Sequence, residues 1–219
     1  TRNYTVTYNH NYTGSTDTTA ISTYVFGGWF KESGLTNVVN NATQVPANNH
    51  TLYAKWTGGS IVLETPVRTG YIFGGWYKES SCINQVLKVG QSYIPASDIT
   101  LYAKWTPITY EIKYNGNGAT SGSMANSPHT YDVAKALTKN AYAKNHTVTF
   151  NYNGATGRNT PASKNINFSF NSWTTQSNGT GNKYTDGESV VNLTSTQGAI
   201  VNLYAQWNNN TYGDLPKPT

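Results

Sequence analysis

The sequence predicts a mainly β protein built from small antiparallel modules in tandem. Only 11% of its 219 residues are charged, against about 25% in a typical soluble protein, and Asn, Thr, Gly, Ser and Tyr take their place. Thr and Tyr favour the pleated surface of a strand, whereas Asn and Gly favour tight turns. The stretch 132–140 is rich in helix formers, so we expect helix to be minor and to fall near 132–139.

Two phrases recur in a fixed order and define the modules. An aromatic phrase reads YVFGGWF, YIFGGWY and FSFNSWT, at 24–30, 71–77 and 168–174. A closing phrase follows each copy as TLYAKW, TLYAKW and NLYAQW, ending at Trp56, Trp105 and Trp207. Self-similarity over such a period indicates a repeat architecture. We expect each closing phrase to form a strand.

A third phrase opens some of the segments. It reads RNYTVTYN, TYEIKYN and KNHTVTFN, and we expect strands over 3–9, 109–115 and 145–151. Large side chains alternate with threonines or charged residues in these copies, which is typical of half-buried antiparallel strands. The middle segment lacks an opening phrase, so it is either incomplete or dependent on a neighbour.

The alternation also assigns two faces to each closing strand. In the second copy the buried face carries Leu101, Ala103 and Trp105. Because side chains alternate along a strand, we predict three core residues, Trp56, Trp105 and Trp207. The opposite, solvent-facing positions hold Tyr53, Tyr102 and Tyr204.

Glycine pairs precede the tryptophan in two of the aromatic phrases, and Asn171 and Ser172 replace the pair in the third. Glycine inside a strand marks a bulge or a close backbone approach. From the conformational freedom of these residues, we expect positive φ at Gly27, Gly74 and Asn171. We expect close packing at Gly28, Gly75 and Ser172.

The phrases divide the chain into modules at 1–57, 58–106 and 107–208, followed by a linker tail at 209–219. The third module carries an extra hairpin-like front at 144–173. A unit of roughly 50 residues buries little surface by itself, and tandem units gain stability from their neighbours. Since the joints at 57–60 and 106–107 are short, we expect an elongated, semi-rigid arrangement.

The stretch PVRTGYIFGGWYKES followed by DITLYAKW resembles the Listeria–Bacteroides repeat, the B-repeat type of internalin-like bacterial surface proteins. The longer third segment looks like a variant of it, so the resemblance extends from Asn3 to Trp207. It implies a β-grasp-like module strung in tandem on secreted or wall-attached proteins, and hence an extracellular, cell-surface or cell-wall location. It also implies a spacer or adhesive role without known chemistry.

The sequence contains none of the common catalytic or metal-binding motifs: a phosphate loop, H-E-x-x-H, an EF-hand loop or G-x-S-x-G. NGNG at 115–118 and TDGES at 185–189 fit hairpin turns. The four histidines lack ligand spacing, and Cys82, the only cysteine, lies in a variable loop. We therefore expect no enzyme activity, cofactor or metal; an enzyme would need groups converging from distant segments.

The net charge of +5 comes from single, scattered Lys and Arg side chains. Without a basic stripe we expect no nucleic-acid binding. No segment approaches the roughly 20 apolar residues of a membrane helix, so we expect no membrane insertion of this part.

The sequence thus favours a non-enzymatic repeat segment of a cell-surface or secreted protein, acting as a spacer or adhesin. Its expected partners are neighbouring repeats of the same chain and a host or cell-surface protein or glycan. The alternative is a carbohydrate-binding module in which Tyr53, Tyr102 and Tyr204 stack on sugar rings, although cross-strand packing also explains those tyrosines. The loops between the two Trp phrases differ completely, whereas the repeated residues are those assigned to the core. This pattern indicates a preserved scaffold.

Overall fold

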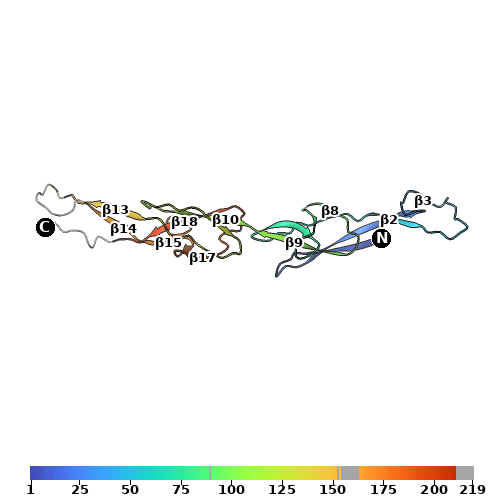
Figure 1. Cartoon of the computed structure of the whole chain (residues 1–219), viewed down its shortest axis with the longest axis horizontal. Coiled ribbons are helices and arrows are strands. Elements are labelled where there is room, and N and C mark those ends of the chain that lie inside the picture. The colour runs from blue at the N-terminus through green and yellow to red at the C-terminus, as the bar shows by residue number, and fades with distance from the viewer. Residues whose placement is uncertain (89, 152, 154–162, 211–219) are drawn as a thin grey trace. The chain divides into compact units, whose positions relative to one another are not determined.

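The computed structural model describes residues 1–88, 90–151, 153 and 163–210, and this part of the chain is all β, with eighteen strands and no helix (Figure 1). The stretch 132–139, where a helix was expected, holds a two-residue strand instead, β12 (Lys135–Ala136). Most of the predicted linker tail, 211–219, lies outside the described residues.

The chain divides into two compact units. The first comprises Thr1–Arg68 and Ile72–Thr106, and the second comprises Thr69–Tyr71 and Pro107–Thr219. Each is described by itself below.

A seven-stranded sheet organises the first unit. Its strands run β3-β2-β1-β9-β6-β7, with β4 added on β2. The bounds are β1 (Arg2–Asn9), β2 (Thr18–Phe30), β3 (Val38–Val39), β4 (Tyr53–Gly58), β6 (Tyr71–Tyr77), β7 (Gln85–Leu87) and β9 (Ile99–Pro107). A separate short pair joins β5 (Ile61–Val62) to β8 (Ser92–Tyr93).

The long strand β2 pairs with two other strands. Its first part pairs antiparallel with β1, and its second part, which carries the first aromatic phrase, pairs antiparallel with β4. Thus the first opening strand and the first closing strand are both bonded to β2, but not to each other.

The opening strand β1 instead pairs in parallel with β9, the closing strand of the second segment. Val6 lies opposite Ile99, and Tyr8 lies opposite Leu101. The expectation of purely antiparallel modules was therefore wrong for this pair. The long intervening chain allows the crossover that parallel strands require, and β1 supplies the opening strand that 58–106 lacks.

The second unit contains a five-stranded sheet in the order β11-β10-β18-β15-β16. The bounds are β10 (Thr109–Asn115), β11 (Ser127–Thr130), β15 (Phe170–Thr174), β16 (Lys183–Tyr184) and β18 (Ile200–Trp207). Two further pairs join β12 to β17 (Ser189–Val190), and β13 (Lys144–Thr149) to β14 (Ser163–Phe168).

The two units share one plan. The order β2-β1-β9-β6-β7 of the first corresponds to β11-β10-β18-β15-β16 of the second. The opening strand β10 also runs parallel to the closing strand β18, with Tyr114 opposite Leu203, as Tyr8 lies opposite Leu101. The strands predicted at the opening and closing phrases are confirmed.

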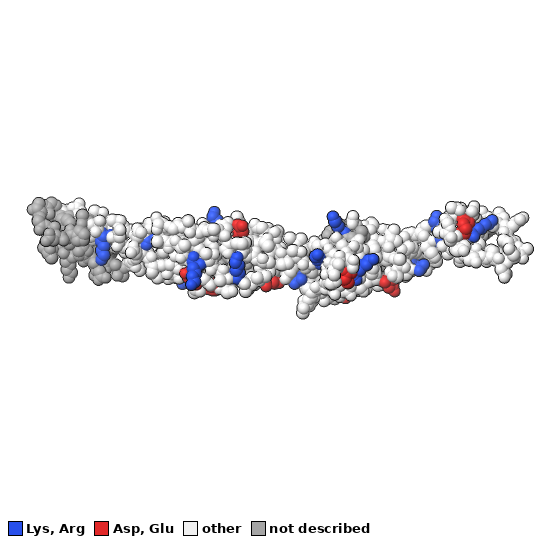
Figure 2. Space-filling model, viewed as in Figure 1, with Lys and Arg blue, Asp and Glu red and all other residues white. Residues whose placement is uncertain are grey.

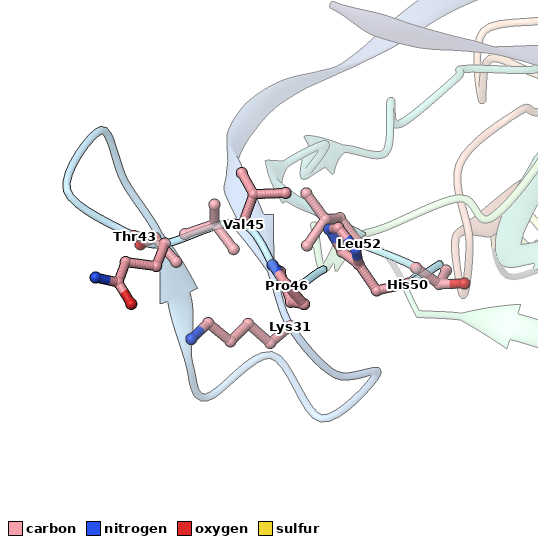
Figure 3. A pocket seen from close by; sticks show the side chains of 9 residues that line it. Lys31, Thr43, Val45, Pro46, His50 and Leu52 are labelled. Atoms are coloured by element: carbon pink, nitrogen blue, oxygen red, sulfur yellow. The ribbon is translucent and has the colours of Figure 1, made fainter. Parts of the chain in front are cut away.

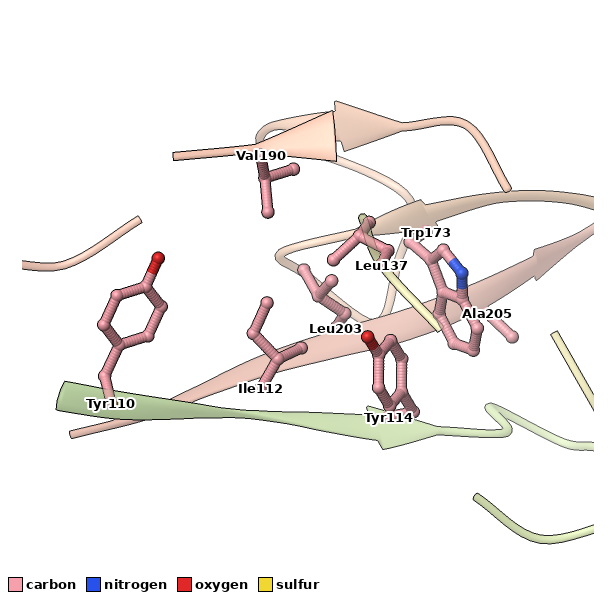
Figure 4. Packing of buried hydrophobic residues seen from close by; sticks show 8 residues of the cluster. All are labelled: Tyr110, Ile112, Tyr114, Leu137, Trp173, Val190, Leu203 and Ala205. Atoms are coloured by element: carbon pink, nitrogen blue, oxygen red, sulfur yellow. The ribbon is translucent and has the colours of Figure 1, made fainter. Parts of the chain in front are cut away.

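Each sheet buries one apolar cluster at this parallel pair. In the first unit it consists of Val6, Tyr8, Leu63, Trp76, Leu101 and Ala103. In the second it consists of Tyr110, Ile112, Tyr114, Leu137, Trp173, Val190, Leu203 and Ala205, with the β10 and β18 side chains meeting Trp173 and Val190 (Figure 4). The alternation of the opening and closing strands therefore predicts most of the core.

The closing tryptophans are not the centre of these cores, which corrects the prediction. Trp76 and Trp173, from the aromatic phrase, are completely buried. Trp105 and Trp207 are half-buried at the edge of each cluster, and Trp56 is half-buried against Phe26. Trp105 and Trp207 lie past the end of the opening strand beside them, so only part of each indole is covered.

The first glycine pair lies at a bulge, where the register between β2 and β4 shifts between Phe26 and Gly28, but the positive φ is at the second glycine of each pair and not at the first. Positive φ occurs at Gly28 and Gly75, at 117° and 110°, and not at Gly27, Gly74 or Asn171. A Cβ at Gly27 or Gly74 would lie 3.4–3.5 Å from side-chain atoms of Lys55 or Lys104, an ordinary van der Waals contact, so these two positions have room for a side chain. The second residue of each pair is therefore the one whose backbone conformation requires glycine.

His129 on β11 gives the second unit a pH-sensitive core group. Its ring is 2% exposed and stacks on Tyr110 with 5.6 Å between centroids. Burial, and then the charge of Lys135, lower the pKa of His129 below its usual 6.5. The folded state resists a proton that the unfolded chain accepts, so the stability is fully present above about pH 6.5 and falls at lower pH.

We therefore expect the melting temperature of the second unit to decrease as the pH is lowered from about 7.5 to about 5.5. Replacing His129 by Phe, which keeps a planar ring, should flatten that dependence. Thermal unfolding of both proteins across this range measures it, and an unchanged slope in the variant would assign the pH response to other groups.

Candidate interaction surface

The first copy of the aromatic phrase is exposed, unlike the other two. Trp29 is 47% exposed, whereas its counterparts Trp76 and Trp173 are fully buried. Phe26, three residues earlier, is also exposed. Contiguous exposed apolar side chains of this size mark interaction surfaces more often than isolated ones do.

The cause is a missing opening strand. Within the described residues β4 pairs only with β2, because β1 is bonded to β9. Leu52 therefore stays half-buried, while its counterparts Leu101 and Leu203 are completely buried. The half-module formed by β2, β3 and β4 has its closing strand and its aromatic phrase, but no described strand pairs with the free edge of β4.

A cavity of about 270 Å³ lies beside this closing strand, and Figure 3 shows side chains of Val45, Pro46, Leu52 and Lys31 around it. The full lining is Lys31, Val39, Thr43, Gln44, Val45, Pro46, His50, Thr51 and Leu52. Small-molecule sites usually measure about 300–1,000 Å³. The size and apolar lining suit one or two inserted side chains better than a large ligand.

The predicted binding tyrosines do not form one platform on a single sheet. Tyr53 is 39% exposed on β4, and Tyr102 is half-buried on β9, with β2 and β1 between these strands in the sheet. Tyr204 is half-buried on β18 in the second unit, opposite Thr174. Of the three, only Tyr53 is beside the exposed aromatic half-module, opposite Phe30.

The asparagine turn after each opening strand joins distant strands, a role that the sequence analysis did not predict although it interpreted 115–118 as a turn. Asn11 and Asn117 have positive φ, 59° and 47°. The Asn11 amide donates to the carbonyls of Ala103 and Ser80, at 3.3 and 3.0 Å. The Asn117 amide donates to the equivalent carbonyls of Ala205 and Ser177, at 2.9 and 2.8 Å. These two bonds fasten the opening strand to the closing strand and to the loop beyond the aromatic phrase.

In the first two copies, a glutamate accepts hydrogen bonds within the loop that follows the aromatic phrase. Glu32 accepts hydrogen bonds from the Thr36 hydroxyl and from the Thr36 and Asn37 amides, at 2.6–2.8 Å. These bonds lower the pKa of Glu32 to about 2. Glu79 accepts equivalent amide bonds, which lower its pKa as well. The shared letters KES were the available signal, so the expectation that these loops differ completely was wrong.

Reactive groups are few around these strands. Burial raises the pKa of the Cys82 thiol, which keeps it protonated near neutral pH. His10 lies 3.0 Å from Glu64. The described residues contain no group of three or more His, Cys, Asp or Glu side chains able to hold a metal ion. Nor does that part contain a helix long and apolar enough to cross a membrane.

Charge is dispersed over the surface. Figure 2 shows blue and red atoms in small separate groups, with uncharged surface between them on the face in view. This agrees with the single spacing of Lys and Arg in the sequence.

Comparison with known proteins gives one family. The family model of the Listeria-Bacteroides repeat domain matches residues 1–55 and again 58–104. No curated protein and no solved structure matches the chain significantly. The resemblance predicted from the phrases is thus confirmed for the first 104 residues.

Proposed function

We propose that this chain is a non-enzymatic spacer or adhesin segment that acts outside the cell. The proposal rests on the match of residues 1–55 and 58–104 to the Listeria-Bacteroides repeat domain, a family typical of bacterial surface proteins. We further propose that 107–207 is a longer variant of the same repeat. The shared strand order and the matching parallel registers of β1–β9 and β10–β18 support this extension.

The observation that carries the proposal is the kind of residue that repeats. Leu101, Ala103 and Trp76 recur as Leu203, Ala205 and Trp173, and all six are completely buried. The turn asparagines recur because they fasten strands together. A shared ligand site would instead preserve side chains that contact the ligand. What is repeated here is a scaffold, as a spacer requires.

Small-angle scattering tests the spacer role. For a stalk of linked modules we expect a radius of gyration well above the roughly 17 Å of a compact domain of this length. The data should be extrapolated to zero protein concentration so that association does not enter. A compact profile would rule the spacer out.

A carbohydrate-binding module is the second candidate, favoured by exposed Tyr53, Phe26 and Trp29. The matched probe is the triple substitution of Tyr53, Tyr102 and Tyr204 by Ser, compared with the wild type in a glycan and host-protein binding screen. For a spacer the two proteins should behave alike. Glycan affinity that disappears in the triple variant would transfer the assignment to sugar binding.

A further inference from the structure

Among the described residues, one closing strand and one opening hairpin lack the strand that completes the other modules. The closing strand β4 pairs with β2 and with no other described strand, and the hairpin β13–β14 forms a two-stranded sheet by itself. In the two complete modules the equivalent edges are joined in parallel, β1 to β9 and β10 to β18. Each uncompleted piece therefore has the part that the other lacks.

We propose that β13 of one copy of this chain pairs in parallel with residues 50–53 of a second copy, at the edge of β4. The resulting sheet would have the order β14-β13-β4-β2-β3. That order reproduces β2-β1-β9-β6-β7 and β11-β10-β18-β15-β16, the two complete modules. The proposal goes beyond the spacer role and does not depend on it.

The opening phrases fix the register. KNHTVTFN of β13 aligns with RNYTVTYN of β1 without a gap, and Thr7 and Tyr8 lie opposite Thr100 and Leu101. By this equivalence Thr149 lies opposite Thr51 of the second copy, and Phe150 lies opposite its Leu52. Residues 50–52 are not in a strand, whereas the equivalent stretch of β9 is, so the pairing would extend β4.

The side chains of β13 match the surface they would cover. Val148 and Phe150 are only half-buried in their own copy, whereas the equivalent Val6 and Tyr8 are buried. In the complete modules this aromatic side chain packs on the buried tryptophan, with ring centroids 4.9 Å apart for Tyr8–Trp76 and 5.0 Å apart for Tyr114–Trp173. Phe150 would pack in the same way on Trp29 of the second copy, beside the cavity at Leu52.

A third turn asparagine supports the same geometry independently. Asn153 has a φ of 50°, and its backbone amide donates to the Asn151 side chain, as that of Asn11 donates to Asn9. The side-chain amides of Asn11 and Asn117 each join two backbone carbonyls, but that of Asn153 donates to no acceptor among the described residues. The equivalent carbonyls in the second copy belong to Ser33 and Ala54.

Such pairing is strand addition to an open edge, with backbone hydrogen bonds for affinity and side-chain pockets for register. It is also heterologous, because each copy uses its hairpin on one neighbour and its β4 on another. A heterologous contact that does not close into a ring grows into chains. Association should therefore proceed beyond the dimer as the concentration rises.

Disulfide trapping tests the register. In a Cys82→Ser background, one chain carries Thr51→Cys and a second, tagged chain carries Thr149→Cys. We expect oxidation to link tagged with untagged chains at least about fivefold more than in the control pair of Thr51→Cys with Thr147→Cys, two residues out of register and beyond disulfide reach. Equal linkage in both pairs, or none in either, would overturn the proposal.

The partner is tested by placing both cysteines on one chain. A second copy as partner predicts links between chains that increase with protein concentration. Links confined to single chains, at every concentration, would mean that the hairpin pairs with its own β4, and would overturn the assignment to a second copy.

Sedimentation velocity tests the asparagine contact. Asn153→Asp keeps the turn and the size of the side chain, but its carboxylate cannot donate hydrogen bonds to the two carbonyls of the second copy. We therefore expect association to weaken about 10–100-fold. Asn165→Asp adds the same charge to the other strand of the hairpin, and should associate like the wild type. Equal association of all three proteins, or a purely monomeric wild type up to millimolar concentration, would contradict the proposal.

Discussion

Replacing Trp173 by alanine is expected to lower the free energy of unfolding of the second unit by about 3–5 kcal/mol, the usual cost of truncating a fully buried large aromatic. Trp173 is completely buried and packs against Tyr114 and Phe170, with ring centroids 5.0 and 5.1 Å away. No neighbouring strand can close the space, because β10, β15 and β18 are fixed by their hydrogen bonds.

The matched control is the same change at Trp29, which occupies the equivalent place in the first copy. Because Trp29 is 47% exposed, its truncation should cost well under half as much in dilute protein. Urea unfolding monitored by circular dichroism gives both values. A loss at Trp29 as large as that at Trp173 would mean that the first half-module is already covered in the single chain.

Introducing a charge at Val6 should destabilise the protein by a similarly large amount, and the effect should reach residues far from Val6 in the sequence. Val6 is completely buried between β2 and β9, opposite Ala20 and Ile99. Val6→Asp buries an unpaired carboxylate, which costs several kcal/mol. We expect it to unfold the second repeat, 58–106, although none of that repeat's residues is changed.

Hydrogen exchange followed by mass spectrometry measures this result at β6 and β9, which should lose protection in the variant. The control is Asn3→Asp on the same strand, where the side chain is exposed and lies before the residues of β1 that pair with β9. Retention of protection in β9 of the Val6→Asp variant would show that the second repeat folds without β1.

The sequence predicts the strands well and their partners poorly, for a physical reason. Alternation along an opening or closing phrase is local, so residues such as Val6 and Leu101 reveal their buried face without knowledge of the fold. The choice of β9 instead of β4 as the partner of β1 depends on tertiary contacts between segments far apart in the chain, and both closing phrases read TLYAKW.

The alternation of side chains also does not predict how deeply each tryptophan is buried. Trp105 and Leu101 are on the same face of the strand, but the face alone does not show where the neighbouring opening strand ends. In the structure Trp105 is at the edge of the core and Trp76 is at its centre. The Trp105 indole N–H donates to the carbonyl of His10, the residue after β1, at 2.7 Å. Trp207 donates equivalently to Gly116, the residue after β10, at 3.0 Å. Each closing tryptophan therefore hydrogen-bonds the residue that follows the opening strand and holds the end of that strand in place.

The sequence predicts a turn at 115–118, but not that the turn asparagines join strands. The spacing Asn-x-Asn follows all three opening strands, in YNHN, YNGN and FNYN. A turn alone explains an asparagine with positive φ, so this spacing does not by itself indicate a contact with another strand. Only the bonds of Asn11 and Asn117 to distant carbonyls show that these residues also set which strands are joined.

The central claim is that a parallel opening strand is what completes a repeat, and the three closing phrases of one chain provide the test. Hydrogen exchange of the wild type at low concentration should be compared over 51–56, 100–105 and 202–207. We expect slow exchange at Leu101–Ala103 and Leu203–Ala205, beneath β1 and β10, and exchange at 51–54 faster by at least about a hundredfold. Equal protection of all three phrases would contradict the claim, because the first has no opening strand in a single chain.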